Sequence, residues 1–433
     1  MIKIKYILFL LFVFTTFAQA QETSNIGLAW AGNTVNSVVF RRNSVVTFRN
    51  QQFISYYDAE GNVILAKRKL GSNEWQIKQT QYKGNIKDAH NSISIIIDGD
   101  GFLHISWDQH ASKLRYAKSI KPSSLELGPE MAMIGKNEIK ATYPEFYKLK
   151  NGDLIFMYRE GSSGQGNLVL NRYQTKEKKW IRMHDNLIDG QGQRNAYWQA
   201  CIDDKGVFHL SWVWREESDV ATNHDMNYAK SLDGGKTWLS SKNEVYSIPM
   251  NLENTQPILV IPQKSELINS TSMATDVKGR PYIATYWRAS NTTIPQYQII
   301  YFDGKEWQIK QVSDRKTPFS LSGSGTKKIP ISRPQIVVNK KTIMVIFRDE
   351  ERGNKVSVAT TKDIQKGNWT IRDINNEDVG QWEPSYDTEL WKNKKKLNLF
   401  VLKTGQGDGE KTEKIAPQMV KIIAFNNDES NEK

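Results

Sequence analysis

The sequence predicts an all-β fold, a seven-bladed β-propeller built from four-stranded antiparallel blades. Seven times along the chain, a turn rich in Asn, Asp, Gly or Lys precedes a strand of alternating apolar and aromatic residues. These phrases recur roughly every 50 to 75 residues, about the length of one four-stranded blade. The 13 Trp, 17 Tyr and 16 Phe supply an aromatic core. Cys201 is the only cysteine, so the fold has no internal disulfide and Cys201 is expected to be a small buried side chain.

Each phrase is expected to contribute one strand to one blade. In chain order they are QQFISYYD near Tyr56, GFLHISWD near Trp107, GDLIFMYR near Tyr158, GVFHLSWVW near Trp212, GRPYIATYW near Trp287, KTIMVIFRD near Phe347 and KKLNLFVL near Phe400. The first and last strand-like segments, Ile26 to Ala29 and Met419 to Phe425, are expected to share a blade and so remove an exposed edge.

One turn within the fourth period has the form S-x-D-x-G-x-T-W, from Ser231 to Trp238. This pattern resembles the Asp-box of sialidase-type propellers, a hairpin in which the Asp side chain binds backbone amides and the Trp packs between strands. Such a box marks the fold and lies away from the chemistry, so it leaves the function open.

The first twenty residues have the features of a secretory signal peptide: Lys3 and Lys5, an apolar run from Tyr6 to Phe17, and Ala18-Gln19-Ala20 as a cleavage signal. We expect residues 1–20 to be removed and residues 21–433 to form a single catalytic propeller domain. The protein is then secreted or periplasmic and monomeric. The apolar run is too short for a membrane span, and no later segment is long or apolar enough.

The formal net charge of +12 makes the chain basic. In an exported protein a basic surface suits an anionic ligand, and acidic polysaccharide is the ligand expected outside the cell. A bland solvated surface explains the charge equally well. Nucleic acid is not expected, because the Lys residues are scattered and no binding motif is present.

Three of the six histidines fall in two neighbouring motifs, DAHNS and GFLHISWDQH. If the two strands are antiparallel neighbours joined by the DGDG turn, His90 and His110 emerge at the same edge of the blade. Two imidazoles at the same edge can act as the acid and the base of a proton-transfer reaction. His104 lies mid-strand and is expected to make an ordinary hydrogen bond.

Two further groups of residues are candidates for a site. The first is a Gly/Ser-rich loop, REGSSGQGN, which leaves room for a polymer and has Tyr158 and Arg172 on either side. The second is the stretch with Cys201, His209 and His224, for which zinc binding is a weak alternative because the spacing is uneven.

The ordered set DAHNSISIIIDGDGFLHISWDQH, YPEF, YREGSSGQGN, LNRY, AYW, HLSWVWR and NHDMNYAKSLDGGKTW resembles the seven-bladed propeller polysaccharide lyases that cut ulvan. It is similar also to the related rhamnosyl-glucuronate lyases and rhamnosidases with BNR repeats. The resemblance implies His90, His110, Tyr158 and Arg172 as catalytic residues and His224 as a residue lining the cleft. The other residues expected to bind substrate are Asn91, Asn167, Tyr197, Trp198 and Arg215.

The residue types suit β-elimination at a uronate. An Arg, here Arg172, pairs with the carboxylate, while a base removes the C5 proton and an acid protonates the leaving oxygen. His90 and Tyr158 are expected to divide these two roles, with His110 assisting. No cofactor is required for this chemistry, and we assign no metal.

Two other functions stay open. The resemblance to rhamnosidases implies a catalytic histidine on the first blade, where this chain has Asn50-Gln51-Gln52-Phe53. A glycoside hydrolase of another type needs a pair of carboxylates, and no such pair stands out here. A carbohydrate-binding propeller without catalysis would show dispersed aromatic residues and no paired acid and base.

Overall fold

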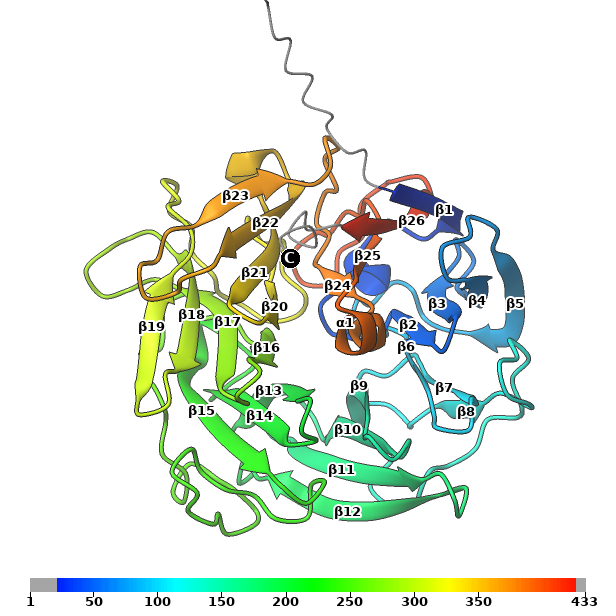
Figure 1. Cartoon of the computed structure of the whole chain (residues 1–433), viewed down its shortest axis with the longest axis horizontal. Coiled ribbons are helices and arrows are strands. Elements are labelled where there is room, and N and C mark those ends of the chain that lie inside the picture. The colour runs from blue at the N-terminus through cyan, green and yellow to red at the C-terminus, as the bar shows by residue number, and fades with distance from the viewer. Residues whose placement is uncertain (1–21, 426–433) are drawn as a thin grey trace, which may run out of the picture.

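The computed structural model describes residues 22–425, whose strands form seven antiparallel sheets around a common axis (Figure 1). The seven-bladed propeller predicted from the repeated phrases is therefore confirmed. The expected signal peptide, residues 1–20, lies outside the described part of the chain. Within residues 22–425 no helix is long and apolar enough to cross a membrane.

Five sheets have four strands, and two have three strands extended by single bridges, Ser119 with Leu127 and Lys230 with Leu239. In each sheet the strands are given from the axis outward. The first three sheets are β2 (Val45–Phe48), β3 (Gln51–Tyr57), β4 (Asn62–Lys69) and β5 (Gln76–Lys83); β6 (Ser94–Ile97), β7 (Leu103–Ser106) and β8 (Tyr116–Lys118); and β9 (Ala141–Lys148), β10 (Leu154–Glu160), β11 (Asn167–Gln174) and β12 (Lys179–Ile188). The last four sheets are β13 (Asn195–Ile202), β14 (Phe208–Arg215) and β15 (Asn223–Ser231); β16 (Ser272–Thr275), β17 (Pro281–Trp287), β18 (Gln296–Phe302) and β19 (Trp307–Gln311); β20 (Gln335–Asn339), β21 (Thr342–Asp349), β22 (Lys355–Thr361) and β23 (Thr370–Asp373); and β24 (Ser385–Tyr386), β25 (Leu397–Val401), β26 (Gln418–Phe425) and β1 (Glu22–Ala29).

Each of the seven phrases forms the second strand of its sheet: β3, β7, β10, β14, β17, β21 and β25. A strand in this position has a strand on either side and a neighbouring sheet on either face. Its side chains are consequently buried almost throughout, as in β14 and β21. This burial explains why the same apolar and aromatic signature recurs in the sequence.

The first and last strands close the ring. β1 pairs antiparallel with β26, with Glu22 opposite Ala424 and Ala29 opposite Gln418. The expected pairing of the two terminal segments is confirmed, and the shared sheet leaves neither segment as a free edge in the ring.

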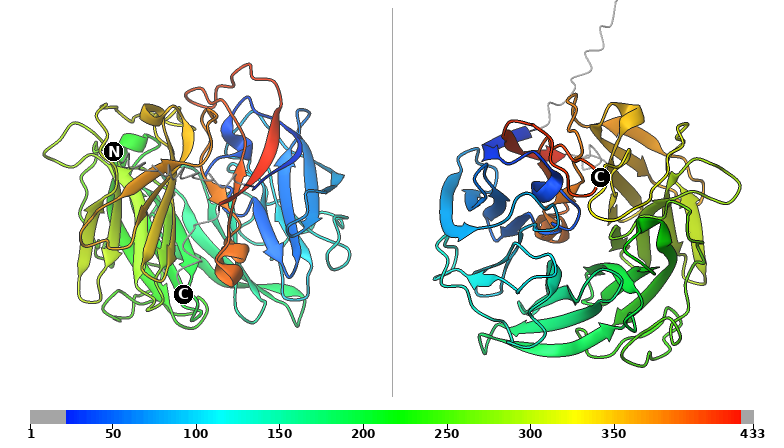
Figure 2. Two further views of the ribbon diagram at one scale, coloured as in Figure 1. Left: turned by 45° about the horizontal axis from the view of Figure 1, so that its top comes forward. Right: turned by 180° about the vertical axis from the view of Figure 1, so that it is seen from behind.

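The ring has two faces. We call the face where the innermost strands begin the upper face and the face where they end the lower face. Figure 1 looks onto the lower face, where the short helix α1 (Thr388–Lys394) lies near the axis, and the right-hand view of Figure 2 looks onto the upper face. The short 3₁₀ helices are η1 (Thr34–Asn36), η2 (Val220–Thr222) and η3 (Glu350–Arg352).

The Asp-box lies at the lower face, directly after β15. Asp233 accepts hydrogen bonds from the Ser231 hydroxyl and from the amides of Lys236 and Thr237. Trp238 is fully buried and packs against Phe208 with ring centroids 5.3 Å apart. The box therefore closes a turn and fills the core, as its sequence indicates.

Candidate functional site

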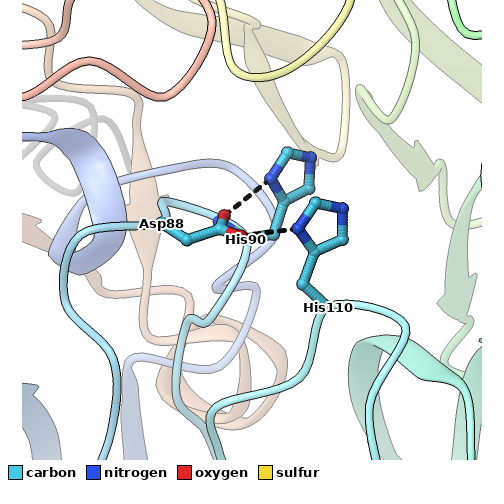
Figure 3. A group of neighbouring side chains, drawn as sticks. All are labelled: Asp88, His90 and His110. Carbon is cyan, nitrogen blue, oxygen red and sulfur yellow. Dashed lines mark hydrogen bonds and ion pairs between the residues drawn. The ribbon is translucent and has the colours of Figure 1, made fainter.

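His90 and His110 meet at the upper face, where Asp88 holds both imidazole rings (Figure 3). His90 lies just before β6 and His110 just after β7, so the antiparallel pairing of these strands brings them to one edge. Nδ1 of His90 lies 3.0 Å from Asp88 Oδ1, and Nδ1 of His110 lies 2.6 Å from Asp88 Oδ2. The rings stack 12° from parallel with centroids 4.0 Å apart. The sequence-based expectation of two imidazoles at one edge is confirmed.

Each ring uses Nδ1 to contact Asp88 and points its Nε2 away from that carboxylate (Figure 3). Both rings can therefore exchange a proton at Nε2 while Asp88 fixes their orientation. The side chain of His90 is 9% exposed and that of His110 is 33% exposed. His110 is thus the more accessible of the two to a ligand.

Burial and nearby charges shift the pKa values of His90 and Asp88 in opposite directions. Burial alone would lower the pKa of His90, but hydrogen bonds and charge interactions with Asp88 and Glu410 raise it to about 9. Burial would raise the pKa of Asp88, yet the hydrogen bonds to His110 and His90 hold it far below its ordinary value. The carboxylate consequently stays ionised beside the imidazoles.

Local hydrogen bonds shape the loop that carries His90. The His90 amide donates to Asp88 Oδ1, and the Asn91 amide donates to the Asp88 carbonyl. The Asn91 side-chain amide donates to the Asn85 carbonyl, and the backbone carbonyl of Asn91 accepts from the Tyr57 hydroxyl. Asn91, expected to bind substrate, thus holds the loop in place.

A second group beside the histidines combines two phenols and two guanidinium groups. The Tyr143 ring lies 5.8 Å from the His90 ring and 5.9 Å from the Tyr197 ring. Arg159 lies over Tyr143 and Arg215 over Tyr197, at 5.0 and 4.3 Å from the ring centroids. The Tyr197 hydroxyl accepts from both guanidinium groups. We call these four residues, together with Asp88, His90, His110 and Glu410, the histidine site.

The two guanidinium groups make a phenol easier to ionise. Burial would raise the pKa of Tyr197, but the charges of Arg215 and Arg159 lower it to about 7. For Tyr143, burial dominates and raises the pKa well above its ordinary value. The histidine site therefore contains one phenol, Tyr197, whose pKa lies near neutral pH.

A β-bulge aims Tyr143 at His90. The pairing of β9 with β10 shifts between Met157 and Arg159, and Tyr143 lies in this irregular stretch with a φ of 59°. Such a left-handed backbone is rare for a bulky residue, and bulges beside functional sites commonly redirect a side chain. The sequence analysis did not assign four residues of the histidine site. Asp88, Tyr143 and Arg159 lie in the motifs DAHNS, YPEF and YREG, whereas Glu410 lies in none of the motifs.

Tyr158 and Arg172 do not join the histidines, contrary to expectation. The Tyr158 ring is fully buried beside Phe156, and its hydroxyl donates to the Asn137 carbonyl at 2.5 Å. Arg172 binds Asp153 Oδ2 at 2.7 Å, in the turn at the lower end of β10. Neighbouring side chains on a strand face opposite ways, so Arg159 points to the site and Tyr158 away from it.

Of the remaining residues expected to bind substrate, Tyr197 and Arg215 lie in the histidine site. Asn167 begins β11 at the upper face, opposite Glu160. Trp198 is buried and donates to Glu145 at 3.0 Å, which is a core position. His224 uses both ring nitrogens, on Glu216 at 2.9 Å and on Asp225 at 3.0 Å.

The structure does not assemble the alternative zinc ligands. Cys201 pairs with His209 across two strands, and His209 contacts the Tyr228 hydroxyl at 2.7 Å. His224 lies opposite Trp214, near the other end of the same sheet. His104 binds Asp98 and Tyr116 in the same way as His209 binds Asp203 and Tyr228, which makes both histidines structural.

The Asp88, His90 and His110 donor atoms lie within 4.8 Å of one another, so we tested whether they fit a metal ion. An ion bound to two imidazoles must lie close to both ring planes, because the nitrogen lone pairs lie in those planes. The planes of His90 and His110 are nearly parallel and stacked. This arrangement fits two hydrogen bonds to one carboxylate and does not fit a metal held by both rings.

A cavity of about 1110 Å³, open to solvent, lies at the lower face around Arg42, Cys201 and Tyr386. Arg42 is paired with Glu145 at 2.9 Å, and burial raises the pKa of Cys201 to about 12. These groups are paired or hard to ionise. The histidine site is therefore the candidate functional site, and this cavity lies on the other face of the ring.

Fold and site together define a β-propeller with a cluster of ionisable groups on its upper face. The profile of the BNR repeat-containing family matches residues 51–315, and the chain belongs to this family. It is similar to the long isoform of ulvan lyase from Glaciecola sp. (strain KUL10), with 24% identity over 328 residues, 60% of this chain and 32% of the relative. It is also similar to the short isoform from Alteromonas sp. (strain LOR), with 23% identity over 36% of this chain and 40% of the relative.

This chain therefore spans less than half the length of the curated relatives that it matches. Among solved structures, polysaccharide lyase Uly1 aligns with a TM-score of 0.69 and 15% identity, covering 94% of this chain and all of that one. A PL25 ulvan lyase bound to -[GlcA(1-4)Rha3S]- aligns with a TM-score of 0.68 and 13% identity, covering 92% of this chain and 96% of that one. At this identity the alignments establish the shared fold.

Proposed function

We propose that the protein is a polysaccharide lyase that cleaves ulvan, or a similar anionic polysaccharide of rhamnose and uronate, by β-elimination. The observation that carries this proposal is the stacked pair His90 and His110 on Asp88, beside Tyr143 and two arginines. The similarity to ulvan lyases supports the class of reaction. Export through residues 1–20 would bring the protein to such a polymer outside the cell.

The reaction moves one proton at each of two positions. A base removes the hydrogen on C5 of the uronate, and the electron pair of that bond forms the C4=C5 double bond. The bond from C4 to the bridging oxygen breaks, and an acid protonates the departing oxygen. Imidazole and phenol groups in the histidine site are suited to both transfers, each contributing about 10²- to 10⁴-fold.

Positive charge makes the C5 hydrogen removable. As the proton leaves, negative charge spreads onto the uronate carboxylate, and nearby cations stabilise it. Arg159 and Arg215 are 2% and 8% exposed, so we propose that they act through their electric field beneath Tyr143 and Tyr197. In this proposal Arg159 takes the place that the sequence suggested for Arg172.

The experiment is to incubate the purified protein with ulvan and follow ultraviolet absorbance, since only elimination creates a conjugated, unsaturated uronate. His90→Gln and His110→Gln should each lose about 10²- to 10⁴-fold in rate. His184→Gln is the matched control, because His184 contacts the Gly235 carbonyl on the lower face. New reducing ends without absorbance would instead identify a hydrolase, and binding without either would identify a carbohydrate-binding propeller.

A further inference from the structure

Glu410 contacts His90 from a distant part of the sequence. It lies between β25 and β26, and its Oε1 is 3.0 Å from His90 Nδ1. Oε2 accepts from the Ala89 amide at 2.9 Å, and Oε1 accepts from the Thr326 amide at 2.5 Å. The carboxylate is thus tied to two other segments of the upper face and has one defined orientation.

Two carboxylates consequently face a single ring nitrogen. Asp88 Oδ1 and Glu410 Oε1 each lie 3.0 Å from His90 Nδ1, whereas His110 Nδ1 contacts Asp88 alone. A buried N–H shared between two anions favours the charged form of its ring. His90 and His110 therefore differ in charge environment although they stack on each other.

The groups that surround the His90 ring bring no positive charge to Nδ1 that would offset the two carboxylates. The rings of Phe40, Tyr143 and His110 surround its imidazole, and the Thr326 hydroxyl lies 3.4 Å from Nδ1. The nearest arginines lie one layer further away. Arg333 covers Phe40, and Arg159 covers Tyr143.

We propose that Glu410 is a positioning residue that, together with Asp88, holds His90 as an imidazolium cation, so that His110, which contacts Asp88 through Nδ1, acts as the base. This inference rests on the proposed lyase function and assigns its two proton transfers. Nε2 of His110 accepts the C5 proton as the C4=C5 bond forms. Nε2–H of His90 donates its proton to the oxygen that leaves C4. The raised pKa of His90, about 9, supports this division.

The test compares Glu410→Gln with Glu413→Gln. Glu413 lies in the same loop but pairs with Lys328, at 3.4 Å. With six histidines in the chain, ¹³C-labelled imidazoles can be assigned by NMR from the His90→Gln and His110→Gln spectra. In Glu410→Gln the titration midpoint of His90 should fall by about one to three pH units. In Glu413→Gln it should stay at the wild-type value.

Activity provides a second readout. The alkaline limb of the kcat/KM profile on ulvan should move to lower pH in Glu410→Gln, and Glu410→Asp, which keeps the charge, should restore most of the wild-type profile. An unmoved His90 midpoint in folded Glu410→Gln, or an equal shift in Glu413→Gln, overturns the role of Glu410. If the midpoint moves but the wild-type protein never produces an unsaturated uronate, the proposed reaction fails while the contact with Glu410 stands.

Discussion

The imidazole rings of His90 and His110 stack 4.0 Å apart, and one carboxylate, Asp88, binds Nδ1 of both. This relationship fixes two imidazole rings side by side, with each Nε2 pointing away from Asp88 (Figure 3). Neither ring can turn without losing its bond to Asp88. The geometry is therefore established before a ligand arrives.

Replacing Asp88 by Asn tests this arrangement. The amide cannot accept both Nδ1–H groups with a full negative charge, so each ring becomes freer to rotate. We expect kcat on ulvan to fall by about 10²-fold or more, with a smaller change in KM. Asp225→Asn, which alters the contacts of Asp225 with His224 and with the Ile261 amide, is the control. Equal losses in both variants would contradict a special role for Asp88.

Tyr143→Phe and Tyr158→Phe separate the phenol of the histidine site from the phenol of the core. The first change removes the hydroxyl of a ring that lies 5.8 Å from the His90 ring and should lower kcat/KM on ulvan by about 10-fold through weaker positioning of the sugar. The second breaks the bond to the Asn137 carbonyl and should cost about 1 kcal/mol of stability with activity retained. Ultraviolet assays and urea unfolding measure the two effects. The reverse pattern would favour the sequence-based assignment of Tyr158.

Arg159→Gln and Arg172→Gln form a matched pair of charge removals on neighbouring strands. Loss of Arg159 removes positive charge beside Tyr197 and Tyr143, so kcat/KM should fall by about 10²-fold or more. Loss of Arg172 releases Asp153 in a lower-face turn and should mainly lower the melting temperature. A protein that needs Arg172 for turnover while fully folded would contradict this assignment.

The stability of the protein should depend on the charge of His90. Its pKa is about 9 in the folded state and about 6.5 in an unfolded chain, so protonated His90 stabilises the fold fully below about pH 6.5. That contribution is lost as the pH rises through 9. The free energy of unfolding should fall across this range by roughly 1 kcal/mol per pH unit. In His90→Gln the urea midpoint should change less with pH, and an unchanged slope would argue against a charged His90.

Chelation tests the conclusion drawn from the stacked ring planes. Treatment with excess EDTA followed by gel filtration should leave the rate on ulvan unchanged, because His90 and His110 do not converge on one point. Elemental analysis before and after treatment provides the measurement. Loss of activity together with a stoichiometric metal, restored by adding the metal back, would contradict the prediction.

The sequence was sufficient for the architecture because each second strand is buried on both faces. That burial produced the seven repeated phrases, and strand pairing across the DGDG turn correctly predicted the meeting of His90 and His110. The expected placement of Tyr158 beside the histidines differs from the structure for a physical reason. The bulge at Tyr143 interrupts the register between β9 and β10, and a nearly continuous apolar strand shows no alternation from which its orientation could be read.

Glu410 was beyond prediction for a different reason. It follows His90 by 320 positions and reaches it only because the last sheet returns to the first. Its local sequence, a Gly-rich turn among charged residues, is typical of any exposed loop. A contact between residues so far apart in the sequence depends on closure of the ring of sheets, and local sequence patterns do not predict it.

The pairing of β1 with β26 has a consequence for when this protein can act. Until the final strand docks, the hairpin that carries Glu410 has no fixed anchor, and the neighbouring loops it joins stay apart. The contacts of Glu410 with the Ala89 and Thr326 amides therefore depend on closure of the ring. A chain interrupted during synthesis or translocation would hold most of its blades and still be inert.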